Sequence, residues 1–215
     1  MKRYRGIRLV IFDLDGTLVD AYPAITRSFN HAMRSLGLGA KAPAVIRRAV
    51  GWGDENLLRP FLAKKDLRKA LSLYRRHHRK ALLENSSLFK GALKLLSYLK
   101  RRGYKLAVAS NRPSRFSLIL MRHLGLDAYF DYMLCADKLK RGKPSPQILR
   151  RIMRRFGFYA RQTLYVGDMV IDAQAGRRAG VSTVIVTTGS SSKKDILREM
   201  PSAVIRNIRQ LSAML

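Results

Sequence analysis

Short apolar runs alternate with helical patterns along most of this chain, and this alternation restricts the fold more than any other feature. The runs at 7–13, 104–110, 163–168 and 181–186 are rich in Val, Ile and Leu and have the length of buried strands. Between the later runs, segments 113–125, 144–157 and 169–180 have apolar residues at helical spacing and a Gly near their ends. The order predicts an α/β fold whose mainly parallel sheet carries helices on both faces.

Residues 21–88 break the alternation. This segment has no convincing strand, but its stretches 23–37 and 67–85 show helical patterns. We therefore expect a core formed by residues 1–20 and 89–215, and an α-helical insertion over 21–88. Because the insertion begins just after the first strand, it should overhang the end of that strand.

Polar residues follow the predicted strands at equivalent places. They are Asp13 and Asp15 after the first run, Ser110 and Asn111 after the second, and Asp168 after the third, with Asp172 one helical turn later. The carboxyl ends of parallel strands share one edge of the sheet, so these residues should converge. Asp13 and Asp15 lie two apart and point to the same side, and their repulsion favours a bound cation. Lys143 should join these residues from the loop before a helix, and Pro144 should lie in the first turn of that helix.

The segments "DLDGTLV", "ASNRP", "GKPSP" and "VGDMVID" resemble, in this order, the four motifs of the haloacid dehalogenase superfamily. The resemblance is to the phosphatase branch with a helical cap, which includes the phosphoglycolate phosphatase-like and β-phosphoglucomutase-like proteins. It covers nearly the whole chain, and four motifs in order are far more specific than any one of them. It implies a Rossmann-like core and a cap inserted after the first motif.

The resemblance also implies roles for individual residues. Asp13 is expected to be the nucleophile that forms an aspartyl phosphate, and Asp15 the general acid and base. The expected Mg²⁺ ligands are Asp13, Asp168 and the backbone carbonyl of Asp15. The groups expected to bind the phosphoryl oxygens are the Ser110 hydroxyl, the Asn111 backbone amide and the Lys143 ammonium. Of the remaining motif residues, Asp172 should orient Lys143 or a metal-bound water, Gly16 should allow a tight turn, and Thr17 should support the nucleophile and the substrate site.

These roles predict a Mg²⁺-dependent phosphatase that acts on a small phosphorylated metabolite. A phosphomutase of the β-phosphoglucomutase type has the same motifs and remains an alternative. A dehalogenase is disfavoured, because dehalogenases lack the second aspartate of the first motif, here Asp15. The helical insertion should govern specificity, and Arg47, Arg48 or Trp52 are candidates to contact the leaving group.

The charge balance suggests a different class of partner. Lys and Arg total 43 against 14 Asp and Glu, a formal net charge of +29 that attracts polyanions. The basic residues are scattered as doublets over many helical segments, which favours a diffuse basic surface over one nucleic-acid groove, although nucleic-acid binding or end processing stays open.

Other features bear on the setting of the protein. The lone Cys135 fits a reducing cytoplasm, and no apolar run is long enough to span a membrane. We expect a monomer or a homodimer. His77 and His78 are adjacent, so they should point apart on a helix and lie on an exposed face, not form a metal site.

Overall fold

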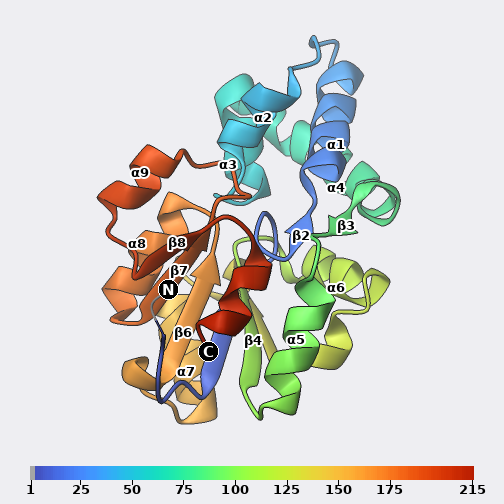
Figure 1. Cartoon of the computed structure of the whole chain (residues 1–215). Coiled ribbons are helices and arrows are strands. Elements are labelled where there is room, and N and C mark those ends of the chain that lie inside the picture. The colour runs from blue at the N-terminus through green and yellow to red at the C-terminus, as the bar shows by residue number, and fades with distance from the viewer. Residues whose placement is uncertain (1–2) are drawn as a thin grey trace.

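The computed structural model describes residues 3–215, and a twisted parallel sheet lies at its centre (Figure 1). Within the described residues the sheet has the strand order β5-β4-β1-β6-β7-β8, and every neighbouring pair is parallel. The strands are β1 (Leu9–Phe12), β4 (Lys105–Ser110), β5 (Tyr132–Cys135), β6 (Thr163–Gly167), β7 (Ser182–Val186) and β8 (Ala203–Ile205). The predicted parallel sheet is confirmed, and two strands that the sequence did not reveal, β5 and β8, extend its edges.

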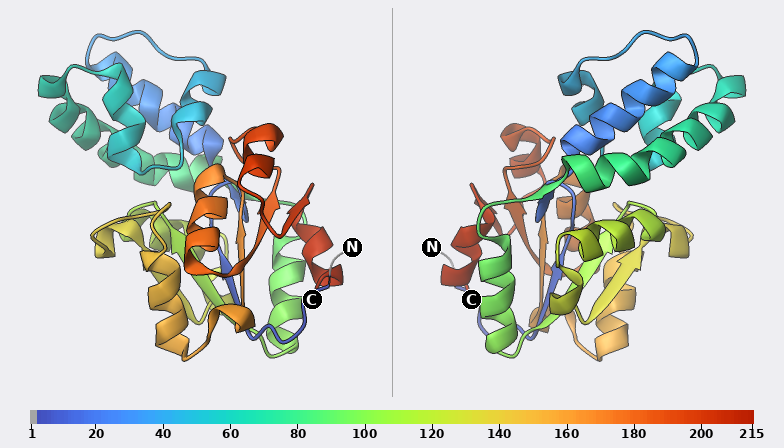
Figure 2. Two further views of the ribbon diagram at one scale, coloured as in Figure 1. Left: turned by 90° about the vertical axis from the view of Figure 1, so that its left-hand side faces the viewer. Right: turned by 90° about the vertical axis from the view of Figure 1, so that its right-hand side faces the viewer.

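Alternation along the central strand divides the core between two helical layers. Val10 and Phe12 belong to the cluster that includes α5 and α6, whereas Leu9 and Ile11 pack with α7 and α8. The helices of the core are α5 (Ala92–Arg101), α6 (Ser114–His123), α7 (Gln147–Phe156), α8 (Val170–Ala179) and α9 (Lys193–Arg198). Figure 2 shows the sheet edge-on between the two layers. Both faces of the sheet are therefore covered, as continuous apolar strands require.

A second group of helices lies beyond the carboxyl ends of the strands (Figures 1 and 2). These helices are α1 (Tyr22–Ser35), α2 (Pro43–Ala49), α3 (Asp54–Leu58) and α4 (Leu67–Asn85), and α1 packs along α4. Short 3₁₀ helices complete the fold at η1 (Arg59–Phe61), η2 (Lys64–Asp66), η3 (Asp127–Tyr129), η4 (Ala136–Lys138), η5 (Ala160–Gln162) and η6 (Ile208–Ala213). We keep the term cap for residues 21–88, whose division from the core stays a prediction.

A short two-stranded ribbon joins the cap to the core. β2 (Val19–Asp20) pairs antiparallel with β3 (Ser87–Leu88), so the chain enters and leaves the cap at one place. The expectation that residues 21–88 contain no strand is therefore wrong at the end of this segment, where β3 lies. The pattern missed β3 because two residues are too few to show an alternation.

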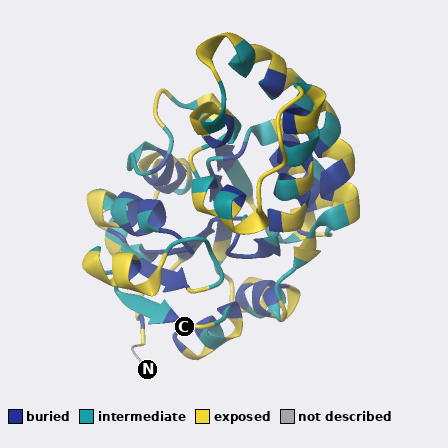
Figure 3. Cartoon of the chain, turned by 90° about the horizontal axis from the view of Figure 1, so that it is seen from above, coloured by how far each residue is buried: buried dark blue, intermediate teal, exposed yellow. Residues whose placement is uncertain are grey.

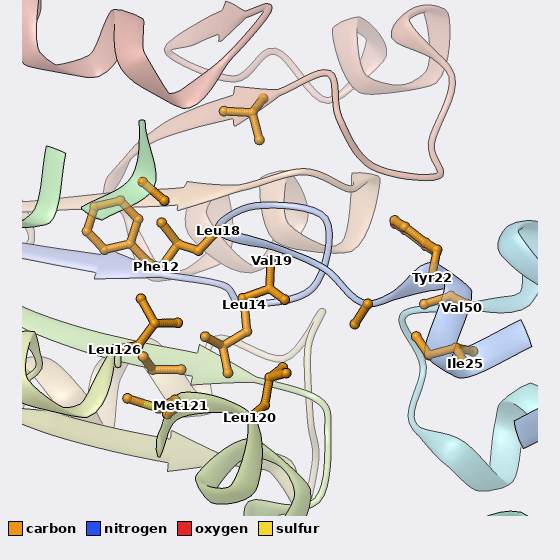
Figure 4. Packing of buried hydrophobic residues seen from close by; sticks show 14 of the residues in the cluster. Phe12, Leu14, Leu18, Val19, Tyr22, Ile25, Val50, Leu120, Met121 and Leu126 are labelled. Carbon is orange, nitrogen blue, oxygen red and sulfur yellow. The ribbon is translucent and has the colours of Figure 1, made fainter. Parts of the chain in front are cut away.

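Apolar packing continues from the sheet into the cap. Phe12, Leu14 and Leu18 lie in the same buried cluster as Tyr22 and Ile25 of α1, as the close view in Figure 4 shows. Seen from above in Figure 3, the buried positions of the helices face inward and their exposed positions face solvent. Among residues 3–215, no helix combines the length and the apolar character needed to cross a bilayer.

Candidate active site

The ends of three neighbouring strands bring the predicted polar residues together. β1 lies between β4 and β6, so Asp13 directly after β1 lies between Ser110 at the end of β4 and Asp168 just after β6. The backbone amide of Asp13 donates to the carbonyl of Val166 at 2.8 Å, which continues the sheet pairing beyond β1. The first carboxylate is therefore held by rigid backbone, as a precise site requires.

Lys143 joins the acidic residues from the loop before α7. Its ammonium lies 2.6 Å from Oδ1 of Asp13 and 2.8 Å from Oδ1 of Asp172. It also donates to the carbonyl of Ala109 at 3.0 Å and contacts the hydroxyl of Tyr165 at 3.1 Å. Burial opposes the charge, but the Asp13 and Asp172 carboxylates raise the pKa of Lys143 above its usual range. This lysine is therefore a buried, permanently charged centre of the site.

The first turn of α8 fixes the position of Asp172. Its Oδ2 accepts from the backbone amides of Asp168 at 3.2 Å and Met169 at 3.0 Å, and its Oδ1 accepts from the Tyr165 hydroxyl at 2.6 Å. A carboxylate at a helix N-terminus is favoured by the unpaired amides there. The expectation that Pro144 lies in the first turn of a helix is wrong, because α7 begins only at Gln147.

Three buried carboxylates surround a space suited to a hard cation. Oxygen atoms of Asp13, Asp168 and Asp172 all lie within 4.8 Å of one another. Burial raises the pKa of Asp13 to about 7, with Lys143 opposing, and burial together with Asp172 raises the pKa of Asp168. One ammonium does not balance three carboxylates, and Mg²⁺ prefers oxygen ligands. Asp13 and Asp168 of this cluster are predicted ligands, and their carboxylates fit the predicted metal, whereas Asp172 is already bound to Lys143.

Asp168 is held tightly by its surroundings. The sequence predicts that Thr17 supports the nucleophile Asp13. In the structure, the Thr17 hydroxyl instead donates to Asp168 Oδ1 at 2.9 Å. A methyl group placed on Gly16 or Gly189 would overlap Asp168 Oδ2. Gly16 also has a φ of 84°, which favours glycine. The absence of a side chain at Gly16 and Gly189 therefore allows both loops to approach the Asp168 carboxylate closely.

Gly189→Ala should therefore displace Asp168 and abolish the effect of Mg²⁺ on thermal unfolding. Gly189 has no positive φ, so the expected change comes from the overlap alone. Gly39→Ala is the matched control, because nothing lies within 4 Å of a Cβ at Gly39. Melting curves with and without Mg²⁺ measure the effect, and an unchanged Mg²⁺ response in Gly189→Ala would show that Asp168 does not bind the metal.

The Asn111 side chain connects three loops, a role that sequence patterns did not reveal. Its Nδ2 donates to the carbonyls of Gly51 at 2.9 Å and Lys143 at 3.0 Å, while its Oδ1 accepts from the Lys143 amide at 2.8 Å. Ser110 is buried next to it, and the Ser110 hydroxyl accepts from the Arg112 amide at 3.1 Å. Asn111 thus ties the cap loop at Gly51 to the loop that holds Lys143.

A cavity opens between the strand ends and the cap. Its floor includes Asp13, Asp15, Ser110 and Lys143, and its walls include apolar side chains of the cap and of α6. Arg112 and His78 also line it, and the sequence analysis assigned a role to neither. Arg112 follows directly after Ser110 and Asn111, but arginines are so frequent in this chain that this one carried no distinguishing signal.

The prediction for His78 is wrong. His78 is only 2% exposed, because its face of α4 packs on α1 and above Arg112, whereas His77 is half-buried and stacks on His31. Burial, together with the Arg112 charge, lowers the pKa of His78 well below its usual range. The adjacent pair indeed points apart, but only the tertiary contacts show which face is buried.

Arg47 and Trp52, two of the cap residues expected to contact the leaving group, are not among the residues that line the cavity. The Arg47 guanidinium donates to the carbonyls of Thr188 at 2.7 Å and Gly189 at 3.2 Å, and it stacks over the Tyr22 ring. Trp52 is 47% exposed, and the cavity is lined by its neighbours Gly51 and Gly53. Arg47 therefore connects the cap to the loop beside Asp168, and contact between these residues and a leaving group stays a prediction.

Basic side chains gather at separate places on the surface. One shallow groove is lined by Lys140, Arg141, Arg150, Arg151 and Arg154, and another by Arg68, Arg75, Arg76 and Arg115. The first belongs to α7 and its preceding loop, the second to α4 and α6. This distribution agrees with a diffuse basic surface, and nucleic-acid binding stays a prediction.

Comparisons with known proteins match this arrangement. The family model of haloacid dehalogenase-like hydrolases matches residues 10–186. A Pseudomonas aeruginosa protein named phosphoglycolate phosphatase 1 is 33% identical over 95% of this chain and 78% of its own length. A phosphoglycolate phosphatase from Nitrosospira multiformis is 30% identical over 97% of this chain and 96% of its own length.

Solved structures agree with the sequence comparison. The crystal structure of a predicted phosphoglycolate phosphatase from Haemophilus somnus has a TM-score of 0.92 and 26% identity, with 97% of each chain covered. The match of the family model spans all four motifs, from Asp13 to Asp172. The chain therefore belongs to the haloacid dehalogenase-like hydrolases, which confirms the expected family and the prediction of an enzyme.

Proposed function

We propose that this protein is a Mg²⁺-dependent phosphatase that hydrolyses a small phosphate monoester through an aspartyl phosphate on Asp13. One observation carries the proposal: Asp13 lies at the floor of a cavity beside a buried ammonium, with two more carboxylates arranged for a cation. The names of the related phosphoglycolate phosphatases support a small phosphorylated acid as substrate.

The first step transfers the phosphoryl group to the enzyme. A carboxylate oxygen of Asp13 attacks phosphorus while the bond from phosphorus to the ester oxygen breaks. The ester oxygen takes a proton from Asp15 and leaves as an alcohol. Lys143 and Ser110 both line the cavity, which supports a role for the ammonium and the hydroxyl in stabilising negative charge on the phosphoryl oxygens.

The second step returns the enzyme to its starting state. Asp15, now a carboxylate, takes a proton from a water molecule whose oxygen attacks phosphorus. The bond between phosphorus and Asp13 breaks, which releases inorganic phosphate and restores both aspartates. Asp172 keeps Lys143 in place through both steps by its 2.8 Å contact with the ammonium. Asp13, Asp168 and the Asp15 carbonyl are the proposed metal ligands, and bound Mg²⁺ would supply positive charge next to the transferring phosphoryl group.

A screen of phosphorylated compounds with purified protein tests the proposed function. The panel should include phosphoglycolate, pyrophosphate, nucleotides and hexose phosphates, each with Mg²⁺ and with EDTA. We expect phosphate release that requires Mg²⁺ and is fastest with a small ester. Conversion of one hexose phosphate into its isomer without net phosphate release, dependent on a catalytic amount of a sugar bisphosphate, would instead identify the phosphomutase alternative. Neither phosphate release nor isomerisation with any compound of the panel would contradict the proposal.

Mg²⁺ should also stabilise the folded protein. At a free concentration 100 times its dissociation constant, a ligand specific for the folded state adds about 2.7 kcal/mol to the free energy of unfolding. For a chain of this size that raises the melting temperature by roughly 5–10 °C. Asp168→Asn should lose this increase while Asp127→Asn, at an exposed position, keeps it. An equal Mg²⁺ response in both variants would rule out Asp168 as a ligand.

A further inference from the structure

The guanidinium of Arg112 holds Asp15 in the geometry that proteins use to recognise carboxylates. Its Nε donates to Asp15 Oδ2 at 2.8 Å and its Nη2 donates to Asp15 Oδ1 at 2.7 Å. Arg112 is only 7% exposed, and it lines the cavity next to Ser110. Two parallel N–H bonds to one carboxylate give both strength and orientation.

His78 of the cap fixes the remaining side of the same guanidinium. Nη1 of Arg112 lies 2.8 Å from Nε2 of His78, and because a guanidinium only donates, Nε2 is the acceptor. On the other side of the ring, Nδ1 lies 3.0 Å from the Ser28 hydroxyl, which itself donates to the Ala24 carbonyl at 2.9 Å. His78 is therefore neutral with its proton on Nδ1. The cap thereby sets the orientation of Arg112.

The observed pairing conflicts with the role proposed for Asp15. Both carboxylate oxygens are bound to Arg112, so neither points freely at a leaving oxygen. Among the described residues that line the cavity, the cationic side chains are Arg112 and Lys143. Lys143 is already bound to Asp13 and Asp172. Arg112, which pairs with the carboxylate of Asp15 alone, can instead exchange this partner for an anionic group on the leaving-group side.

We propose that Arg112 binds a carboxylate carried by the leaving group of the substrate, and that this carboxylate replaces Asp15 on the guanidinium. The exchange preserves the two charge-assisted hydrogen bonds of Arg112, so the buried cation is never left unpaired. Asp15, a carboxylate while it pairs with Arg112, is released only when such a substrate is present, and it takes up a proton from solvent before it donates that proton to the ester oxygen. The substrate class is then a phosphate monoester of a short hydroxy acid. This inference rests on the proposed phosphatase function.

Two esters of equal size test the exchange in the unmodified protein. Phosphoglycolate carries the carboxylate, and its amide replaces that carboxylate with a neutral group of the same shape. With Mg²⁺ present we expect kcat/KM to be about 100-fold higher for phosphoglycolate, with a contribution from kcat as well as from KM. Equal kcat/KM values would overturn the inference and leave the phosphatase proposal standing. Hydrolysis of neither ester, nor of any other in the screen, would overturn both.

Variants of Arg112 identify the residue responsible. Arg112→Gln should reduce the ratio of kcat/KM between phosphoglycolate and its amide, the preference, to less than about 3-fold. Arg112→Lys keeps the charge but cannot form two parallel hydrogen bonds, so it should give an intermediate preference. Arg122→Gln, on the exposed face of α6, should keep the full preference. A proportional loss on both esters in Arg112→Gln would contradict the proposal. If Arg112→Gln does not fold, the ratio of kcat/KM between the two esters in Arg112→Lys tests the proposal in its place.

His78 is assigned a positioning role, so its variants need a readout other than stability. His78→Gln offers a carbonyl oxygen as acceptor for Arg112 and should retain most of the preference. His78→Leu removes the acceptor and should lower the preference by about 10-fold. A preference that stays unchanged in His78→Leu would show that the cap does not orient Arg112.

Discussion

Asp13→Asn should lower kcat by about 10⁴-fold or more and leave the protein folded. The amide is too weak a nucleophile to attack phosphorus, yet it has nearly the shape of the carboxylate and still accepts a hydrogen bond from Lys143, whose ammonium lies 2.6 Å from Oδ1. The melting temperature should stay within roughly 5 °C of the parent, because the change is isosteric and the Lys143 ammonium keeps its ion pair with Asp172.

The control for this experiment is an aspartate outside the site. Asp127→Asn makes the same chemical change at an exposed position and should leave kcat within about 2-fold of the parent. Phosphate release under saturating ester and Mg²⁺ is the measurement for both variants. Near-normal turnover in Asp13→Asn would refute its assignment as the nucleophile.

Lys143→Met should damage both stability and activity. The substitution leaves the buried carboxylates of Asp13 and Asp172 without their shared cation. Breaking a buried ion pair from one side costs about 3–5 kcal/mol, which for a chain of this length lowers the melting temperature by roughly 10 °C. Turnover should fall at least about 10³-fold, because the charge that we propose to stabilise the phosphoryl oxygens is lost.

A second substitution separates the two effects of Lys143→Met. Combining it with Asp172→Asn removes one of the stranded charges and should recover part of the melting temperature without recovering turnover. Lys140→Met, at an exposed position in the loop before α7, is the matched control and should change neither the melting temperature nor turnover. Activity that recovers together with stability in the double variant would show that Lys143 is a structural residue alone.

Local patterns were sufficient for the framework of the fold. Buried central strands such as β1 and β6 consist of continuous apolar residues, so the sequence located them to within about two residues. β5 and β8 lie at the edges of the sheet, and both are short and only partly buried. Their composition therefore hardly differs from that of a loop.

The strand ends illustrate why the acidic cluster was predictable. Asp13 and Asp168 follow strands that the sequence identified, and parallel strands must end at one edge. In contrast, Arg112 is one of 43 Lys and Arg residues, and His78 stands beside a second histidine, so neither residue is distinguished by its sequence. Their burial depends on how α4 lies over the core, and this contact between distant segments leaves no local pattern in the sequence.

The stereochemical course at phosphorus tests the central claim most directly. An ester of chiral thiophosphate labelled with ¹⁷O, hydrolysed in H₂¹⁸O, yields inorganic thiophosphate whose configuration can be read out. Two successive in-line displacements, the first by Asp13 and the second by water, predict overall retention. Inversion would mean that water attacks the ester directly, and it would contradict an aspartyl phosphate on Asp13.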